Sequence, residues 1–408
     1  MATVEIASLP EAVEPPDEYA AAVPPTLSAA LSRDLGLDPP QYLRRAEAAQ
    51  RLATFRAAAD RSFPNTVRGI RLDGAGRPIV TLELGPSTPV VRTAAESAGF
   101  LVETGDRTTS TESFDASAAV DHLPAQPIPD PPVLGATLFR TVRDGIPRFC
   151  QTGFNATDRD GAALAIVNNH CNRNTGSRHD PPGIVPDADT VLMLPATIDQ
   201  VRTAPLGAPI GTLQIAPADS GVDYALLRID DAAAPRFRNN LVAVRETAPI
   251  AIDGITDPVI GAPICKSGVL TGFTCGTITS VDTEYADNGA TVTGSIATGV
   301  HAVSGEGGAP LISGTKAVGI ASSKFLARQA SAEVQLYFEP IRKILEAEPG
   351  LTLRTTSDSA DPSAISSSTR RRRNLATHSR IRRRSLRRCS RWQPMDWNRL
   401  FDETLCTA

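Results

Sequence analysis

The stretch IATGVHAVSGEGGAPLI, residues 296–312, is a glycine-rich turn between two apolar segments. Acyl-transfer enzymes place a nucleophile and an oxyanion hole on tightly turning loops of this kind, where backbone N–H groups face the reacting oxygen. We therefore interpret the stretch as an active-site loop. Its central residues, Gly-Glu-Gly-Gly at 305–308, carry no hydroxyl group.

Within this loop, residues 305–311 (GEGGAPL) resemble the Gly-Asp-Ser-Gly-Gly-Pro-Leu loop of chymotrypsin-family serine proteases. Extension back to Thr298 without a gap also fits the bacterial streptogrisin branch of that family. In this register Gly307 occupies the position of the nucleophilic serine. The loop is therefore either that of a damaged protease or a chance glycine-rich turn, and the rest of the chain favours the damaged protease.

The segment CKSGVLTGFTCGTITSV, which starts at Cys265, is very close to the streptogrisin pattern, with Phe273 in place of the usual tryptophan. Cys265 and Cys275 bracket nine residues that include two glycines, so a local disulfide is geometrically reasonable. A third family disulfide is absent from the pattern. His301 stands where the family has a cysteine, and no partner cysteine follows Ser323.

The segment FCQTGFNATDRDGAALAIVNNHC, which ends at Cys171, carries the next resemblance. In the family, the cysteines equivalent to Cys150 and Cys171 form a disulfide that anchors the strand carrying the catalytic histidine. His170 stands directly before the second cysteine, as that pattern requires. Taken without this context, a single histidine is more often a surface or core residue. Asn168 and Asn169 replace the small residues usual in the family, which places the local packing in question.

In DSGVDYALL, residues 219–227, a carboxylate precedes an apolar strand. Taken alone, Asp223 is as typical of a turn as of a functional site. However, His170, Asp223 and position 307 follow the chymotrypsin order, which differs from the subtilisin and α/β-hydrolase orders. The resemblance implies that His170 is the general base and later the acid, and that Asp223 orients it.

The segment AVGIASSKF, residues 317–325, resembles the strand that lines the specificity pocket. Ser322 falls where the family has a serine that is hydrogen-bonded to the catalytic aspartate. Lys324 occupies a position that is normally glycine, where it could narrow the substrate groove. At the base of the pocket the register gives Gly299 and Val300, with no acid to bind a basic side chain. Trypsin-like specificity for basic residues is therefore not expected.

The resemblance implies an oxyanion hole formed by the backbone N–H groups of Gly305 and Gly307, which survive the substitution. Glu306 replaces the family's aspartate and is one methylene longer, which predicts strain in the buried ion pair that shapes the hole. Without a hydroxyl at residue 307 no acyl-enzyme forms by the family mechanism, and His170 has no nucleophile to deprotonate. The alternative is an active endopeptidase that recruits another serine of the loop, such as Ser304.

The patterns divide the chain into five segments, of which the fourth is predicted to be all-β, with two six-stranded antiparallel barrels like those of chymotrypsin. An α+β segment precedes it, and its phrase SRDLGLDPPQYLRRAEAAQRLA is similar to the pro-regions of streptogrisin-like and alpha-lytic-protease-like enzymes. Such regions assist folding and then inhibit the protease; a generic α/β module is the other interpretation. The segments are a lead-in (1–25), the α+β pro-region (26–120), a proline-rich linker (121–132), the protease domain (133–353) and an arginine-rich tail (354–408).

The 408 residues, 41% of them hydrophobic, are enough for a sizeable core. The net charge of -4 hides an asymmetry, because residues 370–391 hold eleven arginines and no acid. A solvated, disordered tail is the favoured interpretation; the others are a polyanion-binding segment, with Trp392 and Trp397 available for stacking, and the product of a frameshift. The expected partners are a peptide or protein in the inter-barrel cleft and the chain's own pro-region.

Six cysteines without a CxxC pair predict neither a zinc site nor a disulfide scaffold, and no cofactor or metal is expected. No run approaches about 18 apolar residues, so no transmembrane helix and no membrane partner is expected. The disulfide pattern and the resemblance predict an extracellular protein. The first basic residue is Arg33, and no secretory signal precedes it. Either the true start lies upstream, or the protein stays inside the cell with reduced thiols.

Overall fold

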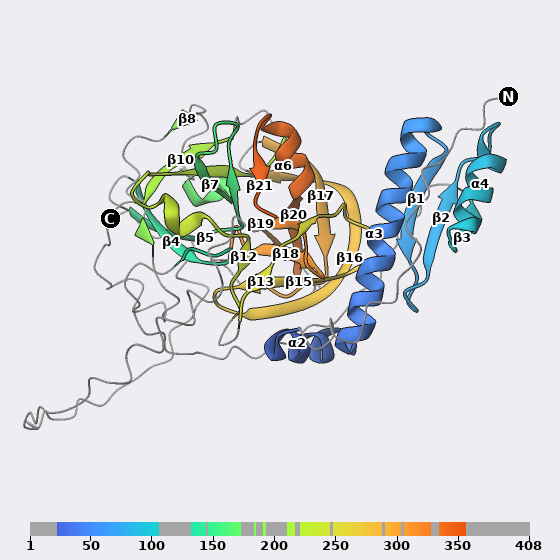
Figure 1. The fold of residues 1–408 in the computed structure, drawn as a ribbon, viewed down its shortest axis with the longest axis horizontal. Helices are drawn as coiled ribbons and strands as arrows, with labels where there is room; N and C mark the ends of the chain where they lie inside the picture. The colour runs from blue at the N-terminus through green and yellow to red at the C-terminus, as the bar shows by residue number, and fades with distance from the viewer. Residues whose placement is uncertain are drawn as a thin grey trace, which may run out of the picture. The chain divides into compact units, whose positions relative to one another are not determined.

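The structure is a computed structural model that describes the chain in eleven ranges (Figure 1). These are residues 23–105, 132–143, 146–172, 183–184, 191–192, 210–216, 221–244, 248–287, 290–302, 306–327 and 334–355. The predicted lead-in up to residue 22, most of the predicted linker and the arginine-rich tail from residue 356 lie outside them.

The first described segment contains both helices and strands, as the sequence predicts for an α+β segment. Asp38 caps the long helix α3: its carboxylate accepts from Gln41 N at 2.7 Å, and the Gln41 side chain accepts from Asp38 N at 3.0 Å. Strands β1 and β2 pair antiparallel, and β3 returns parallel to β2 after helix α4. The elements are α2 (Pro25–Leu35), α3 (Pro39–Ser62), β1 (Val67–Leu72), β2 (Pro78–Leu82), α4 (Thr88–Ser97) and β3 (Leu101–Thr104).

Two sheets follow, one of six strands in the order β21-β6-β7-β11-β10-β8 and one of three in the order β5-β4-β9. Strand β7 is central in the larger sheet and all five of its residues are buried, which fits its unbroken apolar sequence ALAIV. The elements are β4 (Leu138–Arg143), β5 (Ile146–Gln151), β6 (Phe154–Thr157), β7 (Ala163–Val167), the 3-10 helix η1 (Asn169–Asn172), β8 (Gly183–Ile184), β9 (Val191–Leu192), β10 (Gly211–Ile215), β11 (Ala225–Ile229), the 3-10 helix η2 (Ala234–Phe237) and β21 (Thr352–Leu353).

Six of the remaining strands close a barrel, while β12 and β13 form a separate two-stranded sheet and β14 pairs parallel with β19. Strand β19 pairs with both β18 and β20, so the order β15-β16-β17-β20-β19-β18 returns to β15 and makes six antiparallel strands. The elements are β12 (Leu241–Val242), β13 (Ile250–Ala251), β14 (Gly254–Ile255), β15 (Pro263–Gly268), β16 (Gly272–Asp287), β17 (Ala290–Thr298), β18 (Pro310–Ser313), β19 (Lys316–Ala327), β20 (Val334–Pro340) and α6 (Ile341–Ala347). The described residues thus confirm one of the two predicted barrels, and the closure of the other stays a prediction.

Both disulfides implied by the sequence are present. Cys150 at the end of β5 is bonded to Cys171 in η1, with Cα atoms 5.7 Å apart. Cys265 and Cys275 are directly opposite residues of the β15–β16 hairpin, with Cα atoms 4.1 Å apart. The first bond therefore ties the segment that carries His170 to a neighbouring strand.

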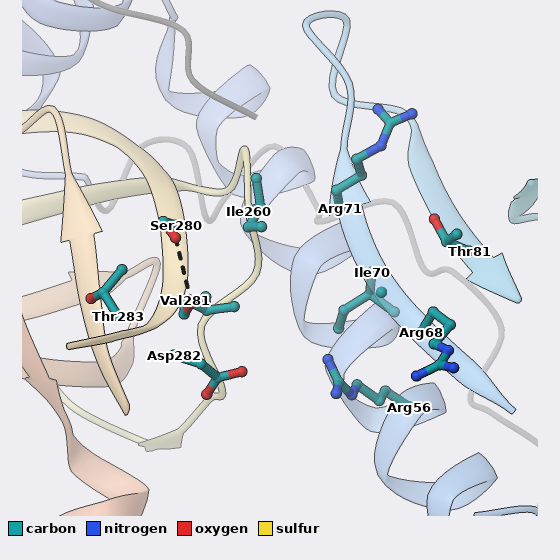
Figure 2. Close-up of a pocket in the computed structure, with 11 residues that line it drawn as sticks. Arg56, Arg68, Ile70, Arg71, Thr81, Ile260, Ser280, Val281, Asp282 and Thr283 are labelled. Atoms are coloured by element: carbon teal, nitrogen blue, oxygen red, sulfur yellow. Dashed lines mark hydrogen bonds between the residues drawn. The ribbon is translucent and has the colours of Figure 1, made fainter. Parts of the chain in front are cut away.

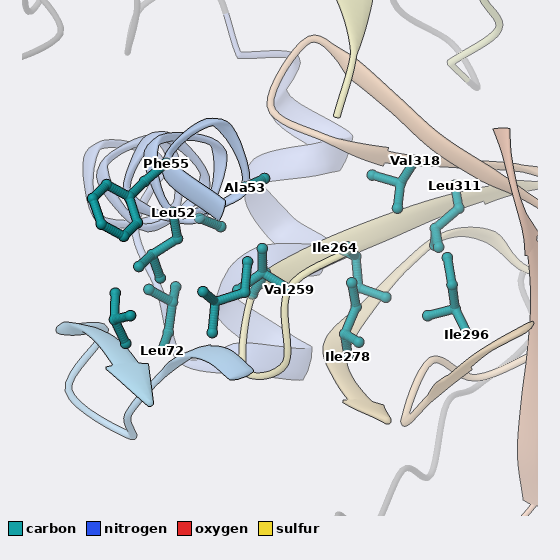
Figure 3. Packing of buried hydrophobic residues seen from close by; sticks show 14 of the residues in the cluster. Leu52, Ala53, Phe55, Leu72, Val259, Ile264, Ile278, Ile296, Leu311 and Val318 are labelled. Carbon is teal, nitrogen blue, oxygen red and sulfur yellow. The ribbon is translucent and has the colours of Figure 1, made fainter. Parts of the chain in front are cut away.

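One cluster of buried apolar side chains extends from α3 and β1 to the inside of the closed barrel (Figure 3). Leu52 and Phe55 of α3 belong to it together with Ile264 and Leu311 of the barrel strands. Polar contacts accompany this packing: Gly314 N donates to the Tyr42 hydroxyl at 2.8 Å. Burial of each such large side chain contributes about 1.5–3 kcal/mol, so the α+β segment and the barrel stabilise one another.

None of the described helices is both long enough and apolar enough to cross a membrane.

Candidate active site

The turn that contains Gly307 is held from two sides by backbone hydrogen bonds. Gln151 N, at the end of β5, donates to Gly307 O at 3.1 Å, and Gly308 N donates to Ala321 O of β19 at 2.9 Å. A Cβ on Gly308 would lie 2.3 Å from Gln151 O, and the φ of this residue is +87°, so position 308 requires glycine. These contacts therefore hold the backbone of residues 307 and 308 in place.

Gly307 itself is under no such restriction. Its φ is outside the left-handed region, and a Cβ built on it meets none of the described atoms within 4 Å. The described residues therefore leave room for a serine Cβ at this position without a change of the backbone. The neighbouring positions 303–305, which include Ser304 and Gly305, lie outside the described residues, so the predicted oxyanion hole is described only at Gly307.

Behind the turn, Glu306 forms a fully buried ion pair with Lys266. Lys266 Nζ lies 2.6 Å from Glu306 Oε2, and both side chains are completely buried. Oε1 accepts from the backbone N–H groups of Leu270 at 3.0 Å and Thr271 at 2.7 Å. Burial raises the pKa of Glu306, but the charge of Lys266 and these hydrogen bonds outweigh it and hold the pKa below its usual value.

The extra methylene of Glu306, from which we expected strain, is accommodated by its surroundings. The carboxylate reaches Lys266 and the amides of the β15–β16 turn, and Gly268 leaves the space that it occupies, since a Cβ there would lie 2.1 Å from Oε1. The contacts of this ion pair thus show no strain.

Asp223 stands just before β11 and is 1% exposed. Its Oδ2 accepts from Asn168 Nδ2 at 2.8 Å and from Ser322 Oγ at 2.7 Å, and the Tyr285 hydroxyl lies 3.4 Å away. The predicted contact between Ser322 and Asp223 is therefore present. Oδ1 is buried and has no hydrogen-bond partner among the described side chains, so one lone-pair direction of this carboxylate remains for another donor.

The backbone of His170 lies in η1, and its side chain is outside the described residues. The segment that carries it reaches both other parts of the site. Asn168, two residues earlier, donates to Asp223, and its backbone N is 3.5 Å from the position of a Cβ on Gly308. The structure thus brings the Gly307 turn, the His170 segment and Asp223 together.

Sequence comparison identifies what this arrangement is related to. The chain is 27% identical to streptogrisin-C of Streptomyces griseus over 377 residues, 85% of this chain and 78% of that protein. It is 28% identical to serine protease 2 of Streptomyces fradiae over 174 residues, 42% of this chain and 85% of that one. The chain is similar in sequence to serine proteases of the streptogrisin branch.

No protein-family model matches the chain. Among solved structures, Thermobifida fusca Protease A is 22% identical to it, with a TM-score of 0.40; the match covers 55% of this chain and 99% of that one.

The predicted pocket residues of the chain are only partly described. Val300 is buried, and its N–H donates to Thr298 Oγ1 at 3.3 Å. Gly299 N donates to Thr277 O of β16 at 3.3 Å. The backbone of Lys324 belongs to β19, but its side chain lies outside the described residues, and its predicted effect on the groove stays a prediction.

Two cavities are lined in part by residues of α3, and both lie apart from the predicted pocket residues. The smaller, of about 210 Å³, lies between α3 and β1 on one side and β16 on the other (Figure 2). Its three arginines already have acidic partners: Arg56 with Asp60, Arg68 with Glu83, and Arg71 with Glu103. It therefore presents no unpaired positive charge to an anion. Among the described side chains, no group of three or more His, Cys, Asp or Glu residues is placed to hold a metal ion.

Sequence reasoning missed three residues that surround Asp223. Asn168 was interpreted as a packing change, whereas its amide donates to the carboxylate. Tyr285 of β16 and Glu339 at the end of β20 were not singled out, because they lie 62 and 116 positions from Asp223. The one available signal was an acid inside the apolar run LYFEPI, where an acid is expected only with a specific partner.

Proposed function

We propose that this chain is a secreted-type serine endopeptidase of the trypsin-like class that has lost acyl-enzyme formation and binds peptides or proteins in the cleft between its barrels. The observation that carries the proposal is Gly307, a residue without a hydroxyl in a turn that would accept one. The loss is confined to a side chain, because the backbone of the turn keeps its support from Gln151 and Ala321.

In this proposal His170 is the general base and Asp223 orients it. Two features support that pairing: the His170 segment contacts Asp223 through Asn168, and Asp223 Oδ1 is buried without a described donor. An imidazole N–H directed at Oδ1 would satisfy this oxygen and fix the tautomer that leaves the other ring nitrogen free to accept a proton. With glycine at position 307, that nitrogen has no hydroxyl to deprotonate.

The activity that remains without a nucleophile is small. In serine proteases that lack one member of the triad, binding and the oxyanion hole together still accelerate hydrolysis roughly 10³-fold over water. Peptide hydrolysis in water is so slow that such a remainder amounts to inactivity. In this proposal the backbone groups that line the cleft still align an extended peptide. Peptide binding is therefore the function that we propose.

The cellular setting is part of the proposal. Two disulfides, Cys150–Cys171 and Cys265–Cys275, form and persist in oxidising compartments. We therefore assign the working protein to the outside of the cell. The α+β segment has the role of a pro-region, and its shared core with the barrel is the contact through which it would act.

The test compares four full-length proteins under one set of conditions: the natural chain, Gly307→Ser, Gly307→Ala and Gly307→Ser with His170→Ala. Each is treated with a fluorophosphonate, which reacts only with an activated serine, and is assayed on small activated esters. We expect labelling and ester hydrolysis by Gly307→Ser alone. Gly307→Ala is the matched control, because it adds the Cβ without the hydroxyl.

Binding is measured on the natural chain by fluorescence anisotropy with a labelled digest of casein, with heat-unfolded chain as the control for nonspecific capture. Saturable binding supports the proposal, and its absence contradicts the binding role. Labelling of the natural chain that is abolished by Ser304→Ala would instead establish an active endopeptidase. If folded Gly307→Ser neither reacts nor hydrolyses esters, His170 and Asp223 are not a preserved dyad.

A further inference from the structure

A second buried carboxyl group lies behind Asp223. Glu339, at the end of β20, is completely buried, and its Oε1 accepts from Ser295 Oγ at 2.6 Å. The Tyr285 hydroxyl lies 3.5 Å from the same oxygen and 2.5 Å from Ser322 Oγ, which in turn donates to Asp223 at 2.7 Å. Two hydroxyl groups therefore connect the two carboxyls.

The charges that face Glu339 come from two other elements. Asp223 lies before β11 and carries the like charge, while Lys343 of α6 approaches Oε2 to 3.8 Å. Lys343 is partly exposed and also donates to the carbonyl oxygens of Gly221, at 2.8 Å, and Thr293. Its charge is thus only partly available to the glutamate, and Oε2 has no hydrogen-bond partner among the described groups.

These surroundings favour the neutral form of Glu339. Burial and then the charge of Asp223 raise its pKa to about 7, against the opposite effects of the Ser295 hydroxyl, the charge of Lys343 and the backbone N–H of Asp223. The protonation state of this carboxyl therefore changes in the pH range in which an ordinary histidine also titrates.

The direction of the hydrogen bonds depends on that state. Ser322 gives its proton to Asp223, so it can accept the proton of Tyr285. A neutral Glu339 can in turn donate to the Tyr285 hydroxyl, and every donor in the chain then points toward Asp223. An ionised Glu339 competes with Ser322 for the proton of Tyr285 and places a second negative charge behind Asp223.

We propose that Glu339 is a positioning residue for the site, which acts on His170 through the Tyr285–Ser322–Asp223 hydrogen bonds and through its own charge. The inference rests on the proposed function, because it takes His170 to be the partner of Asp223. It extends that function by adding a fourth ionisable side chain that no motif of the sequence marks.

The proposal predicts how His170 titrates. Ionisation of Glu339 stabilises the imidazolium, and protonation of His170 favours ionised Glu339, so each group holds its proton more weakly while the other is protonated. The titration curve of His170 in the natural chain should be flattened, with a slope below that of a single proton. In Glu339→Gln the curve should regain the single-proton slope, and its midpoint should fall by about half a pH unit.

The experiment is an NMR titration of the full chain with isotope-labelled histidine, in which the His170 signal is assigned as the one lost in His170→Ala. Asp223→Asn tests the dyad, and Glu339→Gln tests the inference. Glu348→Gln is the matched control, because it removes a carboxylate that bonds Tyr224 at 2.7 Å instead of the Asp223 group. Ser295→Ala is the milder variant; it weakens support for ionised Glu339 and should shift His170 in the same direction by less.

The outcomes distinguish the role of Glu339 from the proposed His170–Asp223 dyad. If Asp223→Asn lowers the midpoint of His170 while Glu339→Gln leaves it unchanged, the inference is wrong and the dyad stands. If Asp223→Asn has no effect, the dyad itself is wrong. Should Glu339→Gln fail to fold, the slope of the natural chain and the shift in Ser295→Ala decide: a single-proton slope with no shift overturns the proposal.

Discussion

Two buried glutamates flank the site and behave in opposite ways. Glu306, behind the Gly307 turn, faces Lys266 and two backbone N–H groups, which hold its pKa low in spite of burial. Glu339, behind Asp223, faces another carboxylate, and burial together with that charge raises its pKa to about 7. Both are equally hidden from solvent. The neighbouring charge, and not burial, decides which of them is ionised.

The difference separates a permanent support from a titratable one. A glutamate with a lowered pKa stabilises the fold above its ordinary pKa, and this contribution is lost as the pH falls through the folded-state value. A glutamate with a raised pKa is best tolerated below its ordinary pKa, and stability is lost as the pH rises toward 7. Acidic pH therefore destabilises the Gly307 turn, and neutral pH destabilises the surroundings of Asp223.

The largest expected effect is on the buried ion pair of Lys266 and Glu306. Lys266→Met leaves Glu306 buried without a counter-charge, which costs about 3–5 kcal/mol in the free energy of unfolding. Chemical denaturation of the oxidised protein at pH 7 measures it. Lys316→Met is the control, because Lys316 forms a partly exposed pair with Asp253 at 2.9 Å, whose loss costs less than about 1 kcal/mol.

A second variant decides whether the charge is the cause. Lys266→Met with Glu306→Gln removes both charges, and it should recover a large part of the lost stability. Equal losses of stability in the single and double variants would mean that the shape of Lys266, and not its charge, makes it necessary. The neighbouring charge would then not explain the behaviour of Glu306.

The next effect is on Glu339 and depends on pH. In the unfolded chain Glu339 ionises near 4.5, but in the fold it keeps its proton to about 7. The natural chain should therefore lose about 2–3 kcal/mol of stability between these values relative to Glu339→Gln, which has no proton to lose. Unfolding curves at pH 4.5, 6 and 8 measure the difference, and an equal difference at all three would show that Glu339 does not titrate in this range.

The sequence predicts those parts of the site that local patterns encode. The contact of Ser322 with Asp223 and both disulfides follow from motifs of a few residues. The partners of the two glutamates do not, because they depend on strand register. Lys266 and Glu306 are 40 positions apart, and Glu339 approaches Asp223 only because β20 pairs with β17 and β19 to close the barrel.

Asn168 offers a smaller test on the Asp223 side. Its amide is completely buried and donates to a charged oxygen at 2.8 Å, so Asn168→Ala should cost about 1.5–3 kcal/mol at neutral pH. Asn169→Ala is the neighbouring control, because the amide of Asn169 is buried and has no hydrogen-bond partner among the described groups. That change should cost less, or nothing. A larger loss for Asn169 than for Asn168 would contradict the role assigned to the Asn168 amide.

The smallest effect is expected at position 307, in the turn itself. Gly307→Ser adds a Cβ that meets none of the described atoms within 4 Å, at a φ outside the left-handed region, so the free energy of unfolding should change by less than about 0.5 kcal/mol. Gly308→Ser is the matched control one residue later: its Cβ would lie 2.3 Å from Gln151 O at a φ of +87°, and more than about 2 kcal/mol should be lost. Thermal unfolding of the two variants beside the natural chain measures both. Equal losses would mean that the turn has moved away from the shape that a nucleophile needs. A silent Gly307→Ser means that Lys266, Glu306 and the backbone of β5 and β19 hold that shape without help from the missing hydroxyl.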